Sequence, residues 1–237
     1  MLYGYGSYGI SIPPSFSASR LSLIDRGMVY AIAHIRGGME KGKKWYEDGK
    51  KRKKLNSFND FISCAKFLKK ENISGNISIH GGSAGGLLIG ASLNISPDTF
   101  HCAVAEVPFV DVLNTILDET LPLTPPEWEE WGNPIKNRSD YDYIRSYSPY
   151  DNIKKQSYPA ILATSGLTDP RVTYWEATKW IAKLRNKKID DNPIFLKTYT
   201  EAGHGGMAGR YNQIREIAFI YAFILWRNNL TKRSISR

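Results

Sequence analysis

The sequence predicts an α/β fold, in which helices cover both faces of a mostly parallel β-sheet. Short apolar, β-prone runs alternate with longer amphipathic runs along the 237 residues, as is typical of parallel sheets joined by crossover helices. The β-prone runs are continuously apolar, which is expected of strands buried on both faces. No internal repeat, low-complexity tract or linker interrupts this pattern, so we expect a single domain over residues 1–237.

The first quarter of the chain is predicted to contain a loop, a short helix, a strand and the start of a longer helix. Residues 2–9 (LYGYGSYG) form a glycine–aromatic loop rather than a regular element. Residues 22–26 end a short helix, and residues 28–35 form a buried strand. Ser57 and Asp60 have the spacing of a capping box, which predicts that the longer helix begins there.

The rest of the chain continues the alternation. Residues 120–150 interrupt it with prolines, aromatics and acids, and we interpret them as a long irregular excursion of the kind that usually carries function. The last helix is predicted to bury a stripe from Ile214 and Ile217 to Leu225. The predicted strands cover 77–79, 102–107, 160–164 and 194–199, and the predicted helices cover 84–93, 109–117, 173–184 and 213–226.

The net charge of +9 raises the question of nucleic-acid binding. Much of the excess lies in residues 41–54, without the aromatic stacking motif or recognition-helix pattern of a nucleic-acid-binding module. We therefore interpret this segment as a solvated loop and helix entry, and expect no nucleic-acid partner.

Composition gives further expectations about location and cofactors. Cys64 and Cys102 lie in apolar segments and match no metal or redox spacing, which favours free thiols in a reducing compartment. The N-terminus lacks the pattern of a signal peptide, and the apolar run 217–226 is too short to span a bilayer. We expect a cytoplasmic protein with no membrane association, no metal and no cofactor.

The segment from Ile77 to Leu88 predicts a catalytic serine. Gly81-x-Ser83-x-Gly85 follows a β-prone run and precedes a helical one, which is the context of a nucleophile elbow. Glycines flank the serine because this strand-to-helix turn is strained and tolerates no bulk. A plain glycine-rich turn is the alternative interpretation.

A nucleophilic serine needs a base, and the base needs an orienting carboxylate, in the chain order Ser, Asp, His for this kind of fold. His204 lies in a loop after the last predicted strand, whereas the other three histidines lie in or at the start of strands. Asp169 lies in a loop after a strand, before Pro170, although an ordinary turn aspartate is equally compatible with this position. The Ala84 amide, directly after the nucleophile, is one expected oxyanion donor.

With these residues identified, the chain resembles the catalytic domain of the prolyl oligopeptidase family of serine peptidases, and within it the oligopeptidase B (protease II) branch, which cleaves after Arg and Lys. The resemblance extends over nearly the whole chain and implies an α/β-hydrolase fold. The matching segments are residues 2–9 (LYGYGSYG), 36–38 (RGG), 45–50 (WYEDGK), 81–86 (GGSAGG), 107–112 (VPFVDV), 129–134 (EEWGNP), 146–152 (SYSPYDN) and 203–206 (GHGG).

The resemblance implies roles for individual residues. Ser83 would be the nucleophile, His204 the base and Asp169 its orienter. Tyr5 would donate its hydroxyl to the oxyanion beside the Ala84 amide.

It also implies residues that bind substrate. Arg171 would hold a substrate backbone carbonyl, and Glu127 and Glu129 would bind the basic side chain before the cut. Independently, the cluster of Glu127, Glu129 and Glu130 in a basic chain favours a cationic ligand, since paired carboxylates suit a guanidinium. An exposed acidic turn remains the alternative.

The chain departs from the family pattern in two ways. Residues 11–15 (SIPPS) lack the acidic residues that relatives place after the Tyr-Gly loop. Relatives also carry an N-terminal β-propeller, so the resemblance implies an N-terminally truncated hydrolase domain without the propeller and the first strands.

Three functional hypotheses follow. The first is an oligopeptidase that cleaves short basic peptides through an acyl-enzyme. The second is a non-catalytic fragment, or one half of a split protein that needs a separate propeller-bearing chain as partner. The third is an esterase or aminopeptidase-like hydrolase of the same fold.

Overall fold

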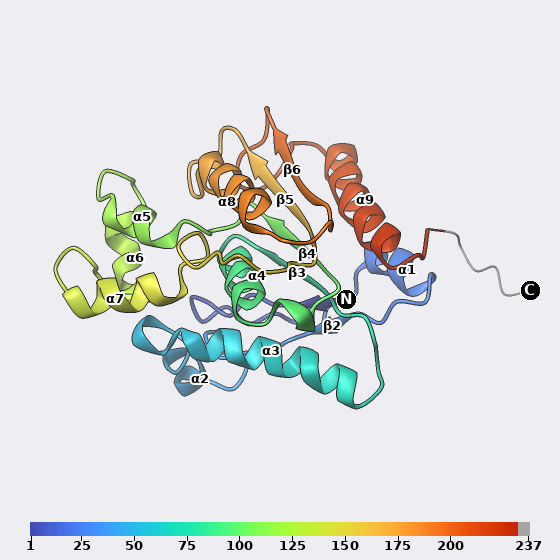
Figure 1. Cartoon of the computed structure of the whole chain (residues 1–237), viewed down its shortest axis with the longest axis horizontal. Coiled ribbons are helices and arrows are strands. Elements are labelled where there is room, and N and C mark those ends of the chain that lie inside the picture. The colour runs from blue at the N-terminus through green and yellow to red at the C-terminus, as the bar shows by residue number, and fades with distance from the viewer. Residues whose placement is uncertain (232–237) are drawn as a thin grey trace, which may run out of the picture.

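A six-stranded parallel sheet runs through the computed structural model, which describes residues 1–231 (Figure 1). Its strand order is β2-β1-β3-β4-β5-β6, and every neighbouring pair is parallel. The sequence prediction of a mostly parallel α/β sheet is therefore confirmed. The strands are β1 (Leu2–Tyr3), β2 (Ala31–Ile32), β3 (Ser78–Gly82), β4 (Cys102–Glu106), β5 (Ala160–Gly166) and β6 (Ile194–Tyr199).

Helices cover both faces of this sheet. α3, α4 and α8 pack on one face and α1 and α9 on the other, each with its own cluster of buried apolar side chains. The two short helices α5 and α6, together with α7, form a group at one end of the molecule (Figure 1). The helices are α1 (Ala18–Ile24), α2 (Lys43–Glu47), α3 (Leu55–Lys70), α4 (Ala84–Ile95), α5 (Val112–Leu117), α6 (Thr124–Trp131), α7 (Arg138–Tyr147), α8 (Tyr174–Lys187) and α9 (Arg210–Arg227), with 3-10 turns at Lys51–Lys53 and Pro97–Thr99.

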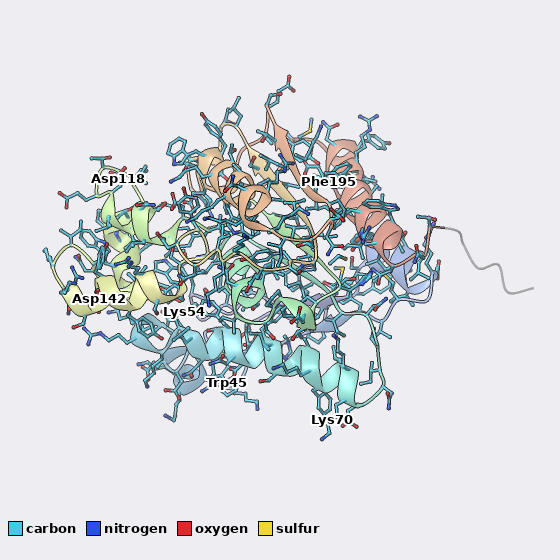
Figure 2. All side chains as sticks on the ribbon, in the orientation of Figure 1. Trp45, Lys54, Lys70, Asp118, Asp142 and Phe195 are labelled. Atoms are coloured by element: carbon cyan, nitrogen blue, oxygen red, sulfur yellow. The ribbon has the colours of Figure 1, made fainter. Side chains whose placement is uncertain are left out.

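The central strands are covered by helices on both faces, which accounts for their continuously apolar sequences. In β4, Ala103 and Ala105 belong to the core under α3, α4 and α8, whereas Cys102 and Val104 belong to the core under α9. Successive side chains point to opposite faces, so a strand covered on both sides must be apolar throughout. Figure 2 shows side chains filling both layers, with Lys70 at the periphery where α3 ends.

Several predicted elements differ from the structure near the N-terminus. Residues 2–3 are a strand rather than a loop, because they pair with both β2 and β3. The strand predicted over 28–35 shortens to Ala31–Ile32. The capping box is wrong: α3 begins at Leu55, and the Ser57 hydroxyl inside it donates to the Arg36 carbonyl instead of capping the helix.

Two further predictions are wrong beyond the middle of the chain. Residues 120–150 are not irregular, since they contain all of α6 and all of α7. On α9, Ile214 and Ile217 are 51% and 37% exposed, whereas Ile220 and Ile224 are buried. The helix is apolar on more than one side, so spacing alone did not identify the face that meets the sheet. No helix within residues 1–231 has the length and hydropathy to cross a membrane.

Candidate active site

Ser83 occupies the turn between β3 and α4. Its backbone has φ 56° and ψ −121°, a strained conformation for a residue with a side chain. Its amide donates to the Glu106 carbonyl at 2.8 Å, which fixes the turn to β4. A Cβ at Gly81 would lie 2.5 Å from the Gly85 carbonyl oxygen, and one at Gly85 would lie 2.9 Å from that of Gly4. Glycine is therefore required on both sides of Ser83 for the chain to pack this closely.

His204 lies between Ser83 and Asp169. Its Nε2 is 3.0 Å from the Ser83 Oγ, and its Nδ1 is 2.8 Å from the Asp169 Oδ2. The three side chains come from loops at the ends of β3, β5 and β6, which the parallel sheet places at one edge. The structure therefore brings together the three residues that the sequence proposed for nucleophile, base and orienter.

Asp169 is placed to hold an imidazole in one orientation. Burial of its carboxylate would raise its pKa, but hydrogen bonds from His204 and from the amides of Arg171 and Val172 outweigh burial and lower it. The carboxylate is thus an anion at neutral pH, with its second oxygen directed at the His204 Nδ1. Such a carboxylate favours the tautomer with a proton on Nδ1, which leaves Nε2 free to accept one from a hydroxyl.

The two loops that carry Asp169 and His204 are tied together. Thr168 donates from its amide and its hydroxyl to the Ala202 carbonyl, at 3.2 Å and 2.9 Å. The Met207 amide donates to Glu216 on α9 at 2.8 Å. These contacts hold a loop that would otherwise be mobile because it is rich in glycine.

A cavity of about 410 Å³ opens beside the Ser83–His204 pair and is lined by Tyr5, Ala84 and Arg171 among others. The Tyr5 hydroxyl makes no hydrogen bond within residues 1–231, and burial raises its pKa to about 12. It therefore remains a protonated, uncommitted donor in the cavity. The Ala84 amide, at the first position of α4, has no acceptor inside the helix.

The acidic residues of α6 separate in the structure. Glu127 lines the cavity, and its Oε2 accepts from the Tyr8 hydroxyl at 3.0 Å and from the Trp131 indole at 2.6 Å. The Glu129 side chain is 87% exposed and pairs with Lys51 instead. Residues two apart on a helix differ by about 200° around its axis, so they cannot face the same cavity. The structure does not bring Glu129 to the site.

Glu130 neither lines the cavity nor faces solvent, because it is buried. Its two carboxylate oxygens accept from the Tyr8 amide at 3.0 Å and from the Tyr46 hydroxyl at 2.7 Å. It ties the Tyr-Gly loop to α2 and α6.

Two buried charged residues around the cavity were missed by sequence analysis. Glu176 on α8 is fully buried, and burial raises its pKa to about 7 although the amides of Val110 and Asp111 donate to it. Lys54, in the segment interpreted as solvated, is only 1% exposed. Both residues share the spacing of their helix's apolar stripe, and this is the signal that would have found them.

No group of three or more potential metal ligands occurs in the part of the chain that the structure describes.

Comparison with known proteins places the chain among peptidases. The model of the prolyl oligopeptidase family matches residues 14–230. Among curated proteins, the chain is 50% identical to dipeptidyl aminopeptidase BI of Pseudoxanthomonas mexicana and 50% identical to protease 2 of Moraxella lacunata, over 94% and 95% of its length. It covers 31% and 33% of those proteins, so it spans about a third of their length.

Solved structures agree with this. Oligopeptidase B from Leishmania major matches with a TM-score of 0.97 at 50% identity, over 100% of this chain and 33% of that one. Oligopeptidase B from Trypanosoma brucei with covalently bound antipain matches with a TM-score of 0.95 at 51% identity, with the same coverage. The fold is therefore that of these α/β hydrolases.

Proposed function

The chain belongs to the prolyl oligopeptidase family, and from this premise we propose that it carries the catalytic centre of a serine oligopeptidase that cuts short peptides after Arg or Lys. The observation that carries the proposal is the position of His204, within hydrogen-bonding distance of both Ser83 and Asp169. Covalently bound antipain in the Trypanosoma brucei relative supports a mechanism through a covalent intermediate.

The reaction follows from these positions. The His204 Nε2 takes the proton from Ser83 as its Oγ attacks the scissile carbonyl carbon, and Asp169 stabilises the resulting imidazolium. The carbonyl oxygen becomes an anion that accepts hydrogen bonds from the Ala84 amide and the Tyr5 hydroxyl. When the tetrahedral intermediate collapses, the C–N bond breaks and His204 gives its proton to the leaving amine. Water then attacks the acyl-enzyme by the same steps and releases Ser83.

Preference for a basic side chain rests on Glu127. Its Oε2 is held by two donors, and its Oε1 accepts no hydrogen bond within residues 1–231, which leaves that oxygen for a cation in the cavity. A charge-assisted hydrogen bond to a carboxylate stabilises binding by about 1.5–3 kcal/mol. Arg171, exposed at the cavity rim, is proposed to hold a substrate carbonyl.

An aminopeptidase-like hydrolase is a second candidate, favoured by the name of the relative from Pseudoxanthomonas mexicana. The two differ in whether a free amino group is required near the cut. An arginyl fluorogenic amide with a blocked N-terminus tests this on the purified protein. Hydrolysis of the blocked amide supports the oligopeptidase, whereas hydrolysis of free dipeptidyl amides only supports the aminopeptidase.

Two proposals concern the setting of this chemistry. A propeller-bearing chain is a proposed partner, and co-purification with a tagged form of this chain tests it. A reducing compartment such as the cytoplasm is proposed on the basis of the free thiols of Cys64 and Cys102, and cell fractionation tests it.

A further inference from the structure

Lys54 is a buried cation that forms no direct ion pair among the described residues, although the charge of the Glu130 carboxylate raises the pKa of Lys54. It is only 1% exposed, and no Asp or Glu within residues 1–231 forms an ion pair with it. Its Nζ donates instead to the Gly6 carbonyl at 2.6 Å and to the Ser7 hydroxyl at 2.7 Å, and lies 5.0 Å from the centre of the Trp131 ring. Burial lowers the pKa of Lys54 to about 8, so at neutral pH it is still an ammonium with three N–H donors. Fully buried lysines are rare because desolvating the charge is costly.

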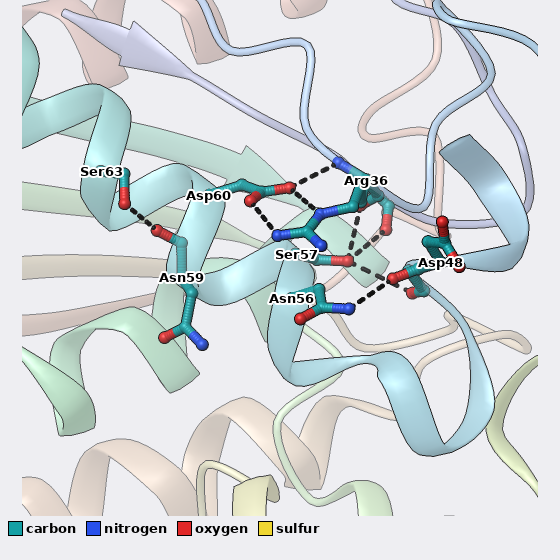
Figure 3. A network of polar contacts seen from close by, with 9 residues as sticks. Arg36, Asp48, Asn56, Ser57, Asn59, Asp60 and Ser63 are labelled. Atoms are coloured by element: carbon teal, nitrogen blue, oxygen red, sulfur yellow. Dashed lines mark hydrogen bonds and ion pairs between the residues drawn. The ribbon is translucent and has the colours of Figure 1, made fainter. Parts of the chain in front are cut away.

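On one side, Lys54 fixes the loop that presents Tyr5. Gly6 and Ser7 follow Tyr5 directly, and the loop packs so tightly that a Cβ at Gly37 would lie 2.0 Å from the Gly6 carbonyl oxygen. Figure 3 shows a polar network around Ser57, whose hydroxyl donates to the Arg36 carbonyl at 2.6 Å. The Gly6 carbonyl accepts from Lys54 at 2.6 Å and from the Ser57 hydroxyl at 3.5 Å, so Lys54 is the closer of its two donors.

On the other side, Lys54 supports the wall that presents Glu127. The ammonium lies against the Trp131 ring, and the Trp131 indole N–H donates to the Glu127 Oε2 at 2.6 Å. Tyr8, two residues beyond Gly6, donates to the same oxygen at 3.0 Å. One buried cation thus contacts both the loop of the proposed oxyanion donor and the ring that holds the proposed specificity carboxylate.

We propose that Lys54 is a positioning residue that fixes the Tyr5 hydroxyl and the Glu127 carboxylate relative to one another. The proposal rests on the proposed function and adds the residue that couples oxyanion stabilisation to recognition of the basic side chain. Lys54 touches neither substrate nor the reacting atoms, and it acts through Gly6, Ser7 and Trp131.

The test compares three variants. Lys54→Met keeps the length of the side chain and removes every donor, whereas Lys54→Gln keeps an N–H donor without the charge. Leu23→Ala, which truncates a fully buried side chain of α1 on the opposite face of the sheet, controls for loss of stability alone. Each is assayed with an N-blocked arginyl amide and with the matching citrullinyl amide, which is uncharged.

The expected kcat for the arginyl amide decreases from wild type to Lys54→Gln to Lys54→Met. Lys54→Met should lose about 100-fold, as when an oxyanion donor is displaced. The preference for the arginyl over the citrullinyl amide should fall together with kcat. Leu23→Ala should keep the kcat and the preference of wild type. A kcat and a preference within twofold of wild type in Lys54→Met would overturn the proposal.

Hydrogen–deuterium exchange in the absence of substrate tests the positioning role of Lys54 independently of activity. Peptides that cover residues 4–8 and 127–131 should exchange about tenfold faster in Lys54→Met than in wild type or Leu23→Ala. Unchanged exchange in either segment overturns the positioning role. A wild type that cuts no arginyl amide contradicts the proposed function alone, because the exchange comparison still decides the role of Lys54.

Discussion

The two walls of the cavity are built in different ways. Ser83, Asp169 and His204 lie in loops after β3, β5 and β6 at one edge of the sheet, where backbone hydrogen bonds of the sheet set their positions. Glu127 lies on a short helix and is oriented by side chains, with Tyr8 reaching it across 119 residues of sequence. The first wall follows from the topology of a parallel sheet, and the second depends on a few buried polar contacts. Substitutions should therefore stop the chemistry at the first wall and change selectivity or stability at the second.

The largest effect is expected from Ser83→Ala. Removing the nucleophile should lower turnover of an arginyl amide by more than about 10⁴-fold, because within residues 1–231 the Ser83 hydroxyl is the one that the His204 Nε2 contacts. Steady-state kinetics measures this, with the exposed Ser63→Ala on α3 as control. Residual turnover above a hundredth of wild type would mean that another group attacks the substrate.

Asp169→Asn should come next, with a loss of about 10³–10⁴-fold in kcat. The amide nitrogen of asparagine would donate where the carboxylate accepts, which stabilises the wrong tautomer of His204. The KM should change little, since Asp169 does not contact substrate. An equal rise in KM with an unchanged kcat would contradict an orienting role.

Two matched substitutions on α6 compare the glutamate that lines the cavity with the glutamate that is exposed to solvent. Glu127→Gln should lower kcat/KM for an arginyl amide by about 10–100-fold, because one charge-assisted hydrogen bond is lost. Glu129→Gln should stay within twofold of wild type, since its side chain is exposed to solvent and paired with Lys51. Equal losses in both variants would show that the cation binds between the two carboxylates in a rearranged helix.

The smallest effect is expected from Glu176→Gln, and it appears in stability. Burial raises the pKa of Glu176 from its ordinary 4.5 to about 7. Between these values the folded state keeps a proton that the unfolded state releases, so the free energy of unfolding falls as pH rises from 4.5 to 7. Glutamine removes this fall and can still accept from the Val110 and Asp111 amides.

The variant should therefore equal wild type near pH 4.5 and exceed it by at most about 3 kcal/mol at pH 8. Urea unfolding at both pH values measures the difference. A variant that is less stable than wild type at pH 8 would show that the ionised carboxylate stabilises the start of α5.

The sequence predictions agree best with the structure where local backbone patterns determine the conformation. The glycines around Ser83 and the loop positions of Asp169 and His204 depend on turn geometry and on strand order, and both leave local signals in sequence. β6 over residues 194–199 was predicted with its observed bounds for the same reason.

The contacts of the second wall could not be predicted from the sequence, because they join residues that are far apart along the chain. Glu127 and Glu129 are equivalent in the sequence, and only the rotation of α6 separates them. Lys54 shares the spacing of the apolar stripe of α3, which is a local signal of burial, but the Gly6 carbonyl that accepts from it lies 48 residues away and leaves no such signal. Charge composition describes residues 41–54 as a whole, and one side chain within this segment departs from that description.

The most direct test of the account is the rate at which a fluorophosphonate labels Ser83, with the adduct located by peptide mass spectrometry. If His204 activates Ser83, wild type should carry one adduct at Ser83, and His204→Gln should be labelled at least about 10³-fold more slowly. Equal labelling rates in the two proteins, or an adduct on another residue, would contradict the account.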